Sequence, residues 1–324
     1  MRAVVIREFG PPRALEPAEV PEPASGPGKV VIDVQFANVT FVETQVRAGK
    51  APHRAMLPAL PAILGNGVGG TVAELGSDAG AERVGPRVVA SLTGTGGYAR
   101  RAVVPAERLI EIPDGVSVRD AVALLADGRT AYSLAGRADL RAGDTVLVEA
   151  AGGGVGTLLV QICRNAGARV VAVAGAERKL ALARDLGADL AVDYSRGDWA
   201  QQVREAAGEV DVVFDGVGGQ VGLAAFGLLG AGGRFCPFGM ASGSFAPVTP
   251  QLAQAHQVSV RAGGAASSEE LVALVRTALT EAAAGRIRPV IGQEFDLAAA
   301  ADAHAAIEAR TTIGKTLLTV PQEQ

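Results

Sequence analysis

The sequence predicts an α/β protein in which a doubly wound parallel sheet is inserted into a smaller β-rich domain. Three regions of the chain indicate this. The first 120 residues are rich in Pro, Gly and short β-branched runs, buried strands alternate with amphipathic helices from Val118 onward, and the chain returns to a mixed pattern after about residue 260. We expect residues 1–120 and 262–324 to form one domain and residues 121–261 to form the other.

Short β-branched runs between turn residues predict the strands of the β-rich domain. They are Met1–Ile6, Lys29–Phe36, Gly69–Leu75, Arg87–Ser91 and Tyr98–Val104. The C-terminal part adds predicted helices at Ser268–Ala284 and Ala298–Arg310 and predicted strands at Glu294–Leu297 and Lys315–Val320.

In the middle of the chain, apolar runs separated by helical segments are typical of parallel strands covered on both faces. The predicted strands are Thr145–Glu149, Arg169–Ala174, Val210–Phe214 and Gly233–Phe238. The predicted helices are Val155–Ala166, Glu177–Leu186 and Val221–Leu229.

The composition excludes several classes of protein. A net charge of −4 with no concentration of Lys and Arg argues against nucleic-acid binding. Cys163 and Cys236 are too few for a disulfide framework and match no zinc spacing. No run approaches the ~20 apolar residues of a membrane span, and the N-terminus does not resemble a signal peptide. We therefore expect a cytoplasmic protein that binds neither nucleic acid nor membrane.

The strongest chemical signal is the turn Ala150-Ala151-Gly152-Gly153-Gly154-Val155-Gly156, which joins a buried strand to a helix. Glycines here let the backbone turn tightly and approach a pyrophosphate closely. The helix then offers free N–H groups and the positive end of its dipole to the anion. With a second strand about 20 residues on, this context predicts a Rossmann dinucleotide site.

The residues after the second strand favour NADPH over NADH. Sites that prefer NADH place an acid at the end of that strand, where it accepts from the ribose 2′-OH. Here the strand ends at Ala174-Gly175 without an acid, and Arg178 and Lys179 follow. A small residue followed by cations leaves room for a 2′-phosphate and pairs with it. Alternatively, the two cations only lie on a solvated helix face.

Taken together, these residues resemble the zinc-independent quinone oxidoreductase (zeta-crystallin-like) branch of the medium-chain dehydrogenase/reductase superfamily. The resemblance covers nearly the whole chain through five segments in order. They are MRAVVIREFGPP, AGDTVLVEAAGGGVG, FDGVGG, AGGRFCPFG and RTTIGKTLLTV. It implies a Rossmann NADPH-binding domain inserted into a GroES-like catalytic domain, and a homodimer formed by edge-to-edge pairing near Gly232–Phe238 and Gln257–Arg261.

The resemblance also implies which residues hold the cofactor. The pyrophosphate would face the backbone N–H groups of Gly153, Gly154 and Val155. The 2′-phosphate would meet Gly175, Lys179, Tyr194 and Arg310, although Tyr194 could instead only cap a strand. The nicotinamide and its ribose would lie beside Thr130, Asp215, Gly216, Val217, Phe238 and Gly239.

A metal is not expected, because the positions of zinc ligands hold other residues. Zinc-dependent members of the superfamily use a Cys within the segment matching Val39–Glu43 and a His-Glu pair after a glycine. This chain has Thr40 in the first place and Gly65-Asn66-Gly67 in the second. Its histidines are scattered, and we expect His304, on an Ala-rich helix, to be structural. Quinone reductases usually have Asn and Tyr where this chain has Thr40 and Gln45.

Metal-free hydride transfer suits conjugated acceptors, because the charge formed spreads onto a distant oxygen that hydrogen bonds can stabilise. The candidate catalytic residues are Thr40, Asp127, Arg129 and Thr130, with Tyr98 and Tyr132 as further proton donors. Asp127 and Arg129 flank Gly128 in what we expect to be a loop. Asp127 could act as an acid in an apolar pocket. Alternatively, it pairs with Arg129 or caps the following helix.

The leading hypothesis is therefore an NADPH-dependent reductase of a small quinone or another α,β-unsaturated carbonyl compound. The alternative is a non-catalytic NADPH-binding sensor or structural protein that has kept the fold. Turnover with a conjugated acceptor distinguishes them.

Overall fold

The computed structural model describes residues 1–51, 53–78, 85–92, 94–263 and 266–321, and the chain divides into two compact units. The first unit comprises Met1–Gly128 and Ser268–Gln324, and the second comprises Arg129–Ser267. Helix α2 (Val118–Ala138) carries the boundary between them. The predicted fold class is confirmed, because the second unit contains a parallel sheet and the first is built mainly of antiparallel strands.

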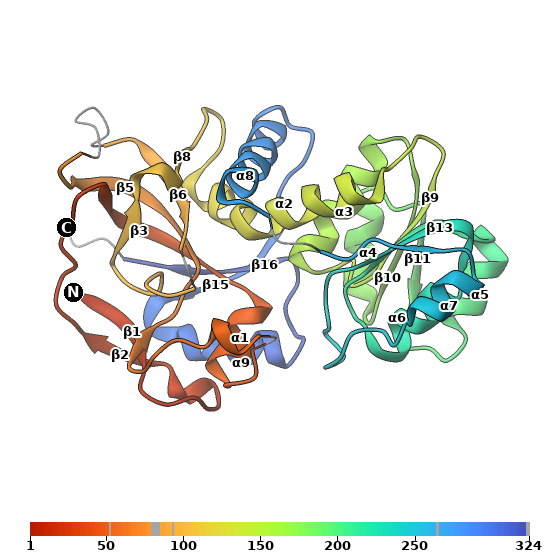
Figure 1. The fold of residues 1–324 in the computed structure, drawn as a ribbon, viewed down its shortest axis with the longest axis horizontal. Helices are drawn as coiled ribbons and strands as arrows, with labels where there is room; N and C mark the ends of the chain where they lie inside the picture. The colour runs from red at the N-terminus through yellow and green to blue at the C-terminus, as the bar shows by residue number, and fades with distance from the viewer. Residues whose placement is uncertain (52, 79–84, 93, 264–265, 322–324) are drawn as a thin grey trace. The chain divides into compact units, whose positions relative to one another are not determined.

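The second unit is a six-stranded parallel sheet with the order β11-β10-β9-β12-β13-β14 (Figure 1). Its strands are β9 (Thr145–Val148), β10 (Arg169–Ala174), β11 (Leu190–Asp193), β12 (Val210–Asp215), β13 (Leu229–Pro237) and β14 (Ser259–Val260). Its helices are α3 (Gly154–Asn165), α4 (Glu177–Asp185), α5 (Trp199–Ala207), α6 (Gly219–Phe226) and α7 (Pro250–Ala255). The strand order reverses between β9 and β12, which is the point where ligands bind in open α/β sheets.

The β-branched strands of this unit form its core. Val171, Val173 and Val213 are fully buried and pack with Trp199 of α5 and Phe226 of α6. Parallel strands buried on both faces need no polar alternation, which is why they read as continuous apolar runs in the sequence.

The first unit contains a seven-stranded sheet and a three-stranded sheet. The larger has the order β15-β16-β3-β5-β6-β8, with β7 also paired to β3, and the smaller has the order β2-β1-β4. The strands are β1 (Arg2–Ile6), β2 (Glu16–Glu19), β3 (Lys29–Val39), β4 (Ala62–Ile63), β5 (Gly67–Leu75), β6 (Arg87–Ser91), β7 (Arg101–Pro105), β8 (Leu109–Glu111), β15 (Ile291–Asp296) and β16 (Lys315–Thr319). The helices wholly within this unit are α1 (Phe41–Arg47), α8 (Ser268–Ala283) and α9 (Ala300–Glu308).

Two local predictions are wrong. The segment Asp127–Thr130 is not a loop, because it lies inside helix α2. Helix α8 packs closely against α2 at Gly128, where a Cβ would lie 2.8 Å from the Cβ of Ala278. Glycine fits this position of the helix because it has no side chain to clash with α8. Tyr98 precedes strand β7 instead of opening it. Within the described residues, we find no helix that combines the length and apolar character of a membrane span.

Candidate active site

The glycine-rich turn has the predicted strand–turn–helix geometry. Strand β9 ends at Val148, and α3 begins at Gly154 with Gly153 as its N-cap. No side chain caps this helix. The Gly153 N–H, which the resemblance assigns to the pyrophosphate, donates to the Ala150 carbonyl at 2.8 Å. The N–H groups of the first helical turn, those of Gly154 and Val155, are the ones that can meet an anion.

Three of the four residues that the resemblance assigns to the 2′-phosphate belong to the second unit: Gly175, Lys179 and Tyr194. Lys179 of α4 lies on the turn, since a Cβ at Gly152 would be 2.6 Å from the Cβ of Lys179. The Tyr194 ring lies against Gly175, where a Cβ would be 3.1 Å from its Cε2. No acidic side chain stands at the end of β10, and Arg178 is exposed on α4. The geometry fits a phosphorylated ribose, because the site offers a cation and space without a carboxylate.

The residues predicted beside the nicotinamide ribose also lie together. Strands β12 and β13 are parallel neighbours with Asp215 opposite Pro237. The backbone N–H groups of Phe238 and Gly239 both donate to the Asp215 carbonyl, at 2.9 and 3.1 Å. Gly216 and Val217 follow directly on the turn into α6. The carboxyl ends of β12 and β13 thus form one corner of the candidate cofactor site.

In the first unit, Thr40 is the N-cap of α1 and forms a capping box with Glu43. The Thr40 backbone N–H and its hydroxyl both donate to Oε2 of Glu43, at 2.7 and 2.9 Å. The other carboxylate oxygen accepts from the Asn66 N–H at 2.8 Å. Glu43 is buried, and burial raises the pKa of its carboxyl group despite these hydrogen bonds and the nearby Lys315. The Thr40 hydroxyl proton is therefore engaged with Glu43.

A second buried cluster lies against this one. The Tyr98 hydroxyl and Nε2 of His304 are 2.9 Å apart, and both side chains are fully buried. Burial, then the Glu43 carboxyl, raises the pKa of Tyr98 well above its ordinary value. Burial, then the charge of Arg47, lowers the pKa of His304 to about 3, so this imidazole is neutral. His304 is a structural residue, as predicted, and buried Tyr98 supports the fold.

Asp127 forms a buried ion pair that neither sequence interpretation named. Its Oδ1 lies 2.9 Å from Nζ of Lys315 on β16, and the two side chains are 13% and 4% exposed. This partner is a cation on a strand, which differs from the predicted Arg129 or helix N-terminus. An acid role for Asp127 stays a prediction.

Gly67, which stands where zinc-dependent relatives have the Glu of a His-Glu pair, is closely surrounded by side chains. A Cβ at Gly67 would lie 2.6 Å from Cδ2 of Leu125 and 2.9 Å from Nδ2 of Asn38. A side chain at this position would therefore have to displace the ends of the Leu125 and Asn38 side chains. Among the described residues, no group of three or more His, Cys, Asp and Glu side chains could hold a metal ion. Cys163 and Cys236 are buried free thiols, and burial raises their pKa values to about 12 and about 11.

The remaining predicted residues fall on both units. Arg129 and Thr130 lie on the part of α2 that belongs to the second unit. Arg310 lies in the first unit, just after α9, with a left-handed backbone (φ 56°). The structure brings the nucleotide residues of the second unit together and leaves the placement of Arg310 beside them a prediction.

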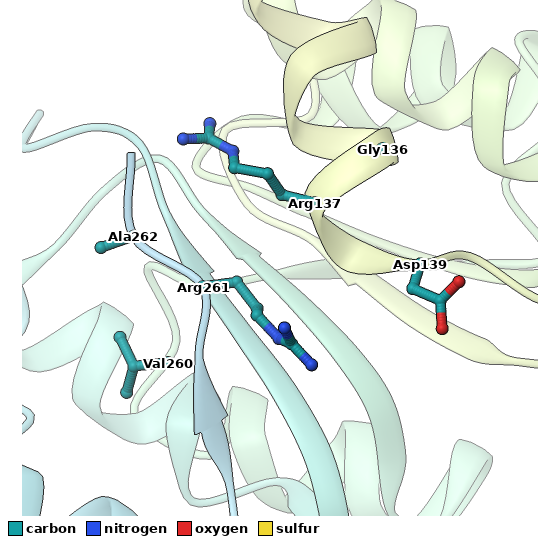
Figure 2. Close-up of a pocket in the computed structure, with 6 residues that line it drawn as sticks. All are labelled: Gly136, Arg137, Asp139, Val260, Arg261 and Ala262. Atoms are coloured by element: carbon teal, nitrogen blue, oxygen red, sulfur yellow. The ribbon is translucent and has the colours of Figure 1, made fainter. Parts of the chain in front are cut away.

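The second unit also has a pocket on its surface (Figure 2). It is lined by Gly136, Arg137, Asp139, Val260, Arg261 and Ala262. None of the predicted cofactor residues lines it, and the guanidinium groups of Arg137 and Arg261 point in different directions (Figure 2). We therefore place the candidate site at the carboxyl ends of β9, β10, β12 and β13 instead.

Sequence reasoning missed several buried charged residues, among them Glu43, Glu149 and Lys315. Glu43 carried one recognisable signal, because Thr40 and Glu43 have the spacing of a capping box. In the sequence, Glu149 is recognisable only as the residue that ends an apolar strand. Lys315 is recognisable only as the residue that begins one.

Comparisons with known proteins cover nearly the whole chain. Residues 26–114 match the alcohol dehydrogenase GroES-like domain, and residues 154–279 match the zinc-binding dehydrogenase domain. Quinone oxidoreductase from Pseudomonas aeruginosa is 31% identical, over 98% of this chain and 99% of its own. A 2-haloacrylate reductase from Burkholderia sp is 32% identical, over 99% of each chain. A mycobacterial protein solved in complex with NADPH is 33% identical, with a TM-score of 0.88 over 98% of this chain and 100% of its own.

Proposed function

Because this chain belongs to the quinone oxidoreductase branch of the medium-chain dehydrogenase/reductase superfamily and is an NADPH-dependent oxidoreductase, we propose that it reduces quinones or other α,β-unsaturated carbonyl compounds without a metal. The observation that carries this proposal is the packing at Gly67. Leu125 and Asn38 occupy the space that a ligand side chain would need there. Carbonyl reduction would lack a Lewis acid at such a site, whereas a conjugated acceptor disperses the charge it gains.

The residues of the second unit would hold the cofactor. The N–H groups of Gly154 and Val155 would bind the pyrophosphate, whereas the Gly153 N–H donates to the Ala150 carbonyl at 2.8 Å. Lys179, with Arg178, would pair with the 2′-phosphate beside Gly175 and Tyr194. The turn Asp215–Val217, together with Phe238, Gly239 and Thr130, would border the nicotinamide and its ribose, and Arg310 would add a further cation. NADPH supplies the hydride when it is bound.

The protein must also orient the acceptor and allow a proton to arrive. Thr40, Asp127, Arg129 and Thr130 are the candidates for these tasks. The Thr40 hydroxyl donates to Glu43, so in this arrangement it can accept a hydrogen bond from a substrate but not donate one. Asp127→Asn tests the acid role: unchanged turnover across the pH range would exclude it.

The similarity to 2-haloacrylate reductase supports a conjugated acceptor, because an acrylate carries its double bond next to a carboxyl carbon. The deciding assay is NADPH oxidation with a simple quinone, an enone and an enoyl thioester in parallel. We expect turnover with at least one, and the fastest identifies the acceptor class. Tight NADPH binding without turnover in any would favour the non-catalytic alternative.

A homodimer through β14 belongs to the same proposal. This strand ends the parallel sheet, and its residues Ser259 and Val260 are exposed, Val260 by 43%. An exposed strand edge with an apolar side chain is a surface that another strand can cover. Val260→Lys should shift the protein from dimer to monomer in light scattering. A wild-type monomer at micromolar concentration would contradict this part.

A further inference from the structure

Two acidic side chains meet in the interior of the second unit. Glu149 follows β9 and Asp215 ends β12, and both are fully buried. Their carboxyl groups are neighbours, because both accept from the same Val217 N–H. Helix α6 closes off one side, because a Cβ at its Gly222 would lie 2.6 Å from Oδ2 of Asp215.

Each carboxyl group has one oxygen bound to the backbone of the next turn. Oε2 of Glu149 accepts from the Val217 N–H at 3.0 Å. Oδ1 of Asp215 accepts from the N–H groups of Val217 and Gly218, at 3.2 and 2.6 Å. The other two oxygens, Oε1 of Glu149 and Oδ2 of Asp215, have no hydrogen-bond donor among the described residues.

A single proton accounts for both orphaned oxygens. Two ionised carboxylates in contact inside a protein repel each other strongly, and such pairs share a proton. Asp215 accepts two backbone N–H bonds and Glu149 only one, so the proton belongs mainly to Glu149, which then donates to Asp215. The groups that act on the Glu149 carboxyl, in the part of the chain that is described, are the Asp215 carboxyl and the Val217 N–H. Burial and then the charge of Asp215 raise the pKa of Glu149 well above its ordinary value.

We infer that protonated Glu149 is a positioning residue for the cofactor: it links the end of β9 to Asp215 and Val217 and so fixes the turn that borders the nicotinamide ribose. Loss of the proton would put two negative charges in contact beneath this turn and loosen it. NADPH binding would then weaken as the pH rises. The cofactor part of this inference rests on the proposed position of the 215–217 turn.

The shared proton is tested by infrared spectroscopy, which needs neither cofactor nor acceptor. The wild type at neutral pH should show the C=O stretch of a protonated carboxyl group, shifted in D2O. Glu149→Gln should remove this band, and Glu205→Gln, a control at an exposed position on α5, should keep it. Spectra of the wild type and Glu149→Gln without such a difference overturn the shared proton.

The positioning role is tested by NADPH dissociation constants from pH 7 to 9.5, where the charge of the 2′-phosphate is nearly constant. Wild-type affinity should fall by up to tenfold per pH unit once the pair loses its proton. In Glu149→Gln the amide still donates to Asp215 and accepts from the Val217 N–H. This variant should therefore bind NADPH like the wild type at pH 7, and its dissociation constant should not change with pH. Glu149→Ala should bind at least roughly tenfold more weakly at pH 7.

If the infrared band of the protonated carboxyl group is lost within this pH range, parallel pH curves for the wild type and Glu149→Gln overturn the positioning role, even if Glu149→Ala fails to fold. Equal dissociation constants for a folded Glu149→Ala variant and the wild type overturn it as well. Both measurements are made without an acceptor, so their outcome is distinct from failure of the proposed reductase activity.

Discussion

The buried pair Asp127–Lys315 should couple α2 to β16 strongly, and removing one partner should cost far more than removing both. Lys315→Met leaves the Asp127 carboxylate with 13% exposure and no ammonium 2.9 Å away. It also deprives Glu43 of a nearby positive charge. Asp127→Leu leaves a lysine ammonium that is 4% exposed.

The magnitude follows from the distance and the burial. Two unit charges 2.9 Å apart attract by roughly 6 kcal/mol at an effective dielectric constant of about 20. Desolvation offsets much of this, so the net effect of removing one partner is about 3–5 kcal/mol. Lys315→Met should be the more harmful change because it affects two carboxyl groups. The double variant Asp127→Leu/Lys315→Met should recover at least about half of the larger loss.

Urea unfolding with two probes is the assay. Far-UV circular dichroism reports on both units, whereas fluorescence of Trp199, the single tryptophan of the chain, reports on the second unit. The variants should lower the urea concentration at which the first unit loses its circular dichroism signal. The urea midpoint of the Trp199 fluorescence should not change. The matched control is the exposed pair Arg184–Glu177, with side chains 47% and 74% exposed, whose removal should cost less than about 1 kcal/mol.

Additive losses would refute this reasoning. If the losses of unfolding free energy in the two single variants add up to the loss in the double variant, the side chains do not act as a pair. Single losses no larger than those of the exposed control would equally contradict the burial argument.

Four further predictions follow from the contacts. Gly67→Ala should destabilise the first unit by about 2 kcal/mol in thermal unfolding, since its Cβ would be 2.6 Å from Leu125. The control Gly136→Ala, with open space around it, should be neutral or stabilising. Lys179→Ala should weaken NADPH binding roughly tenfold and leave NADH binding nearly unchanged in fluorescence titrations, with Lys29→Ala as the exposed control. Neutral His304 contributes stability that is present above pH 6.5 and is lost as the pH falls toward about 3. Between pH 7 and 4.5, the free energy of unfolding of His304→Gln should therefore fall less than that of the wild type. Cys163 and Cys236 should resist thiol reagents in the native protein at pH 8 and react only on unfolding, as mass spectrometry would show.

The Rossmann sheet could be predicted because its signals are local. The strands β9, β10, β12 and β13 each contain an apolar run that the sequence shows locally, and the turn at Gly152–Gly156 is recognised by its glycine spacing. The outer strands β11 and β14 were not predicted, because they are short and β14 is exposed. The clustering of Gly175, Lys179 and Tyr194 also agrees with the prediction, because these residues follow neighbouring strands and the carboxyl ends of parallel strands meet at one edge.

Residues whose role depends on distant partners could not be predicted. Lys315 is separated from Asp127 by most of the chain, and nothing in the local sequence couples them. Gly128 favoured a loop because glycine is a turn residue, but the contact with Ala278 makes it a helix-packing residue. The pairing of Glu149 with Asp215 depends on β9 and β12 being neighbours, which the strand order decides.

The most direct test of a metal-free NADPH reductase combines metal analysis with turnover. Zinc should be measured in the purified protein, and NADPH oxidation with the best acceptor should be followed before and after exhaustive chelation. The account predicts far less than one zinc per chain and the same rate in both cases. A loss of activity on chelation that added zinc restores would contradict it.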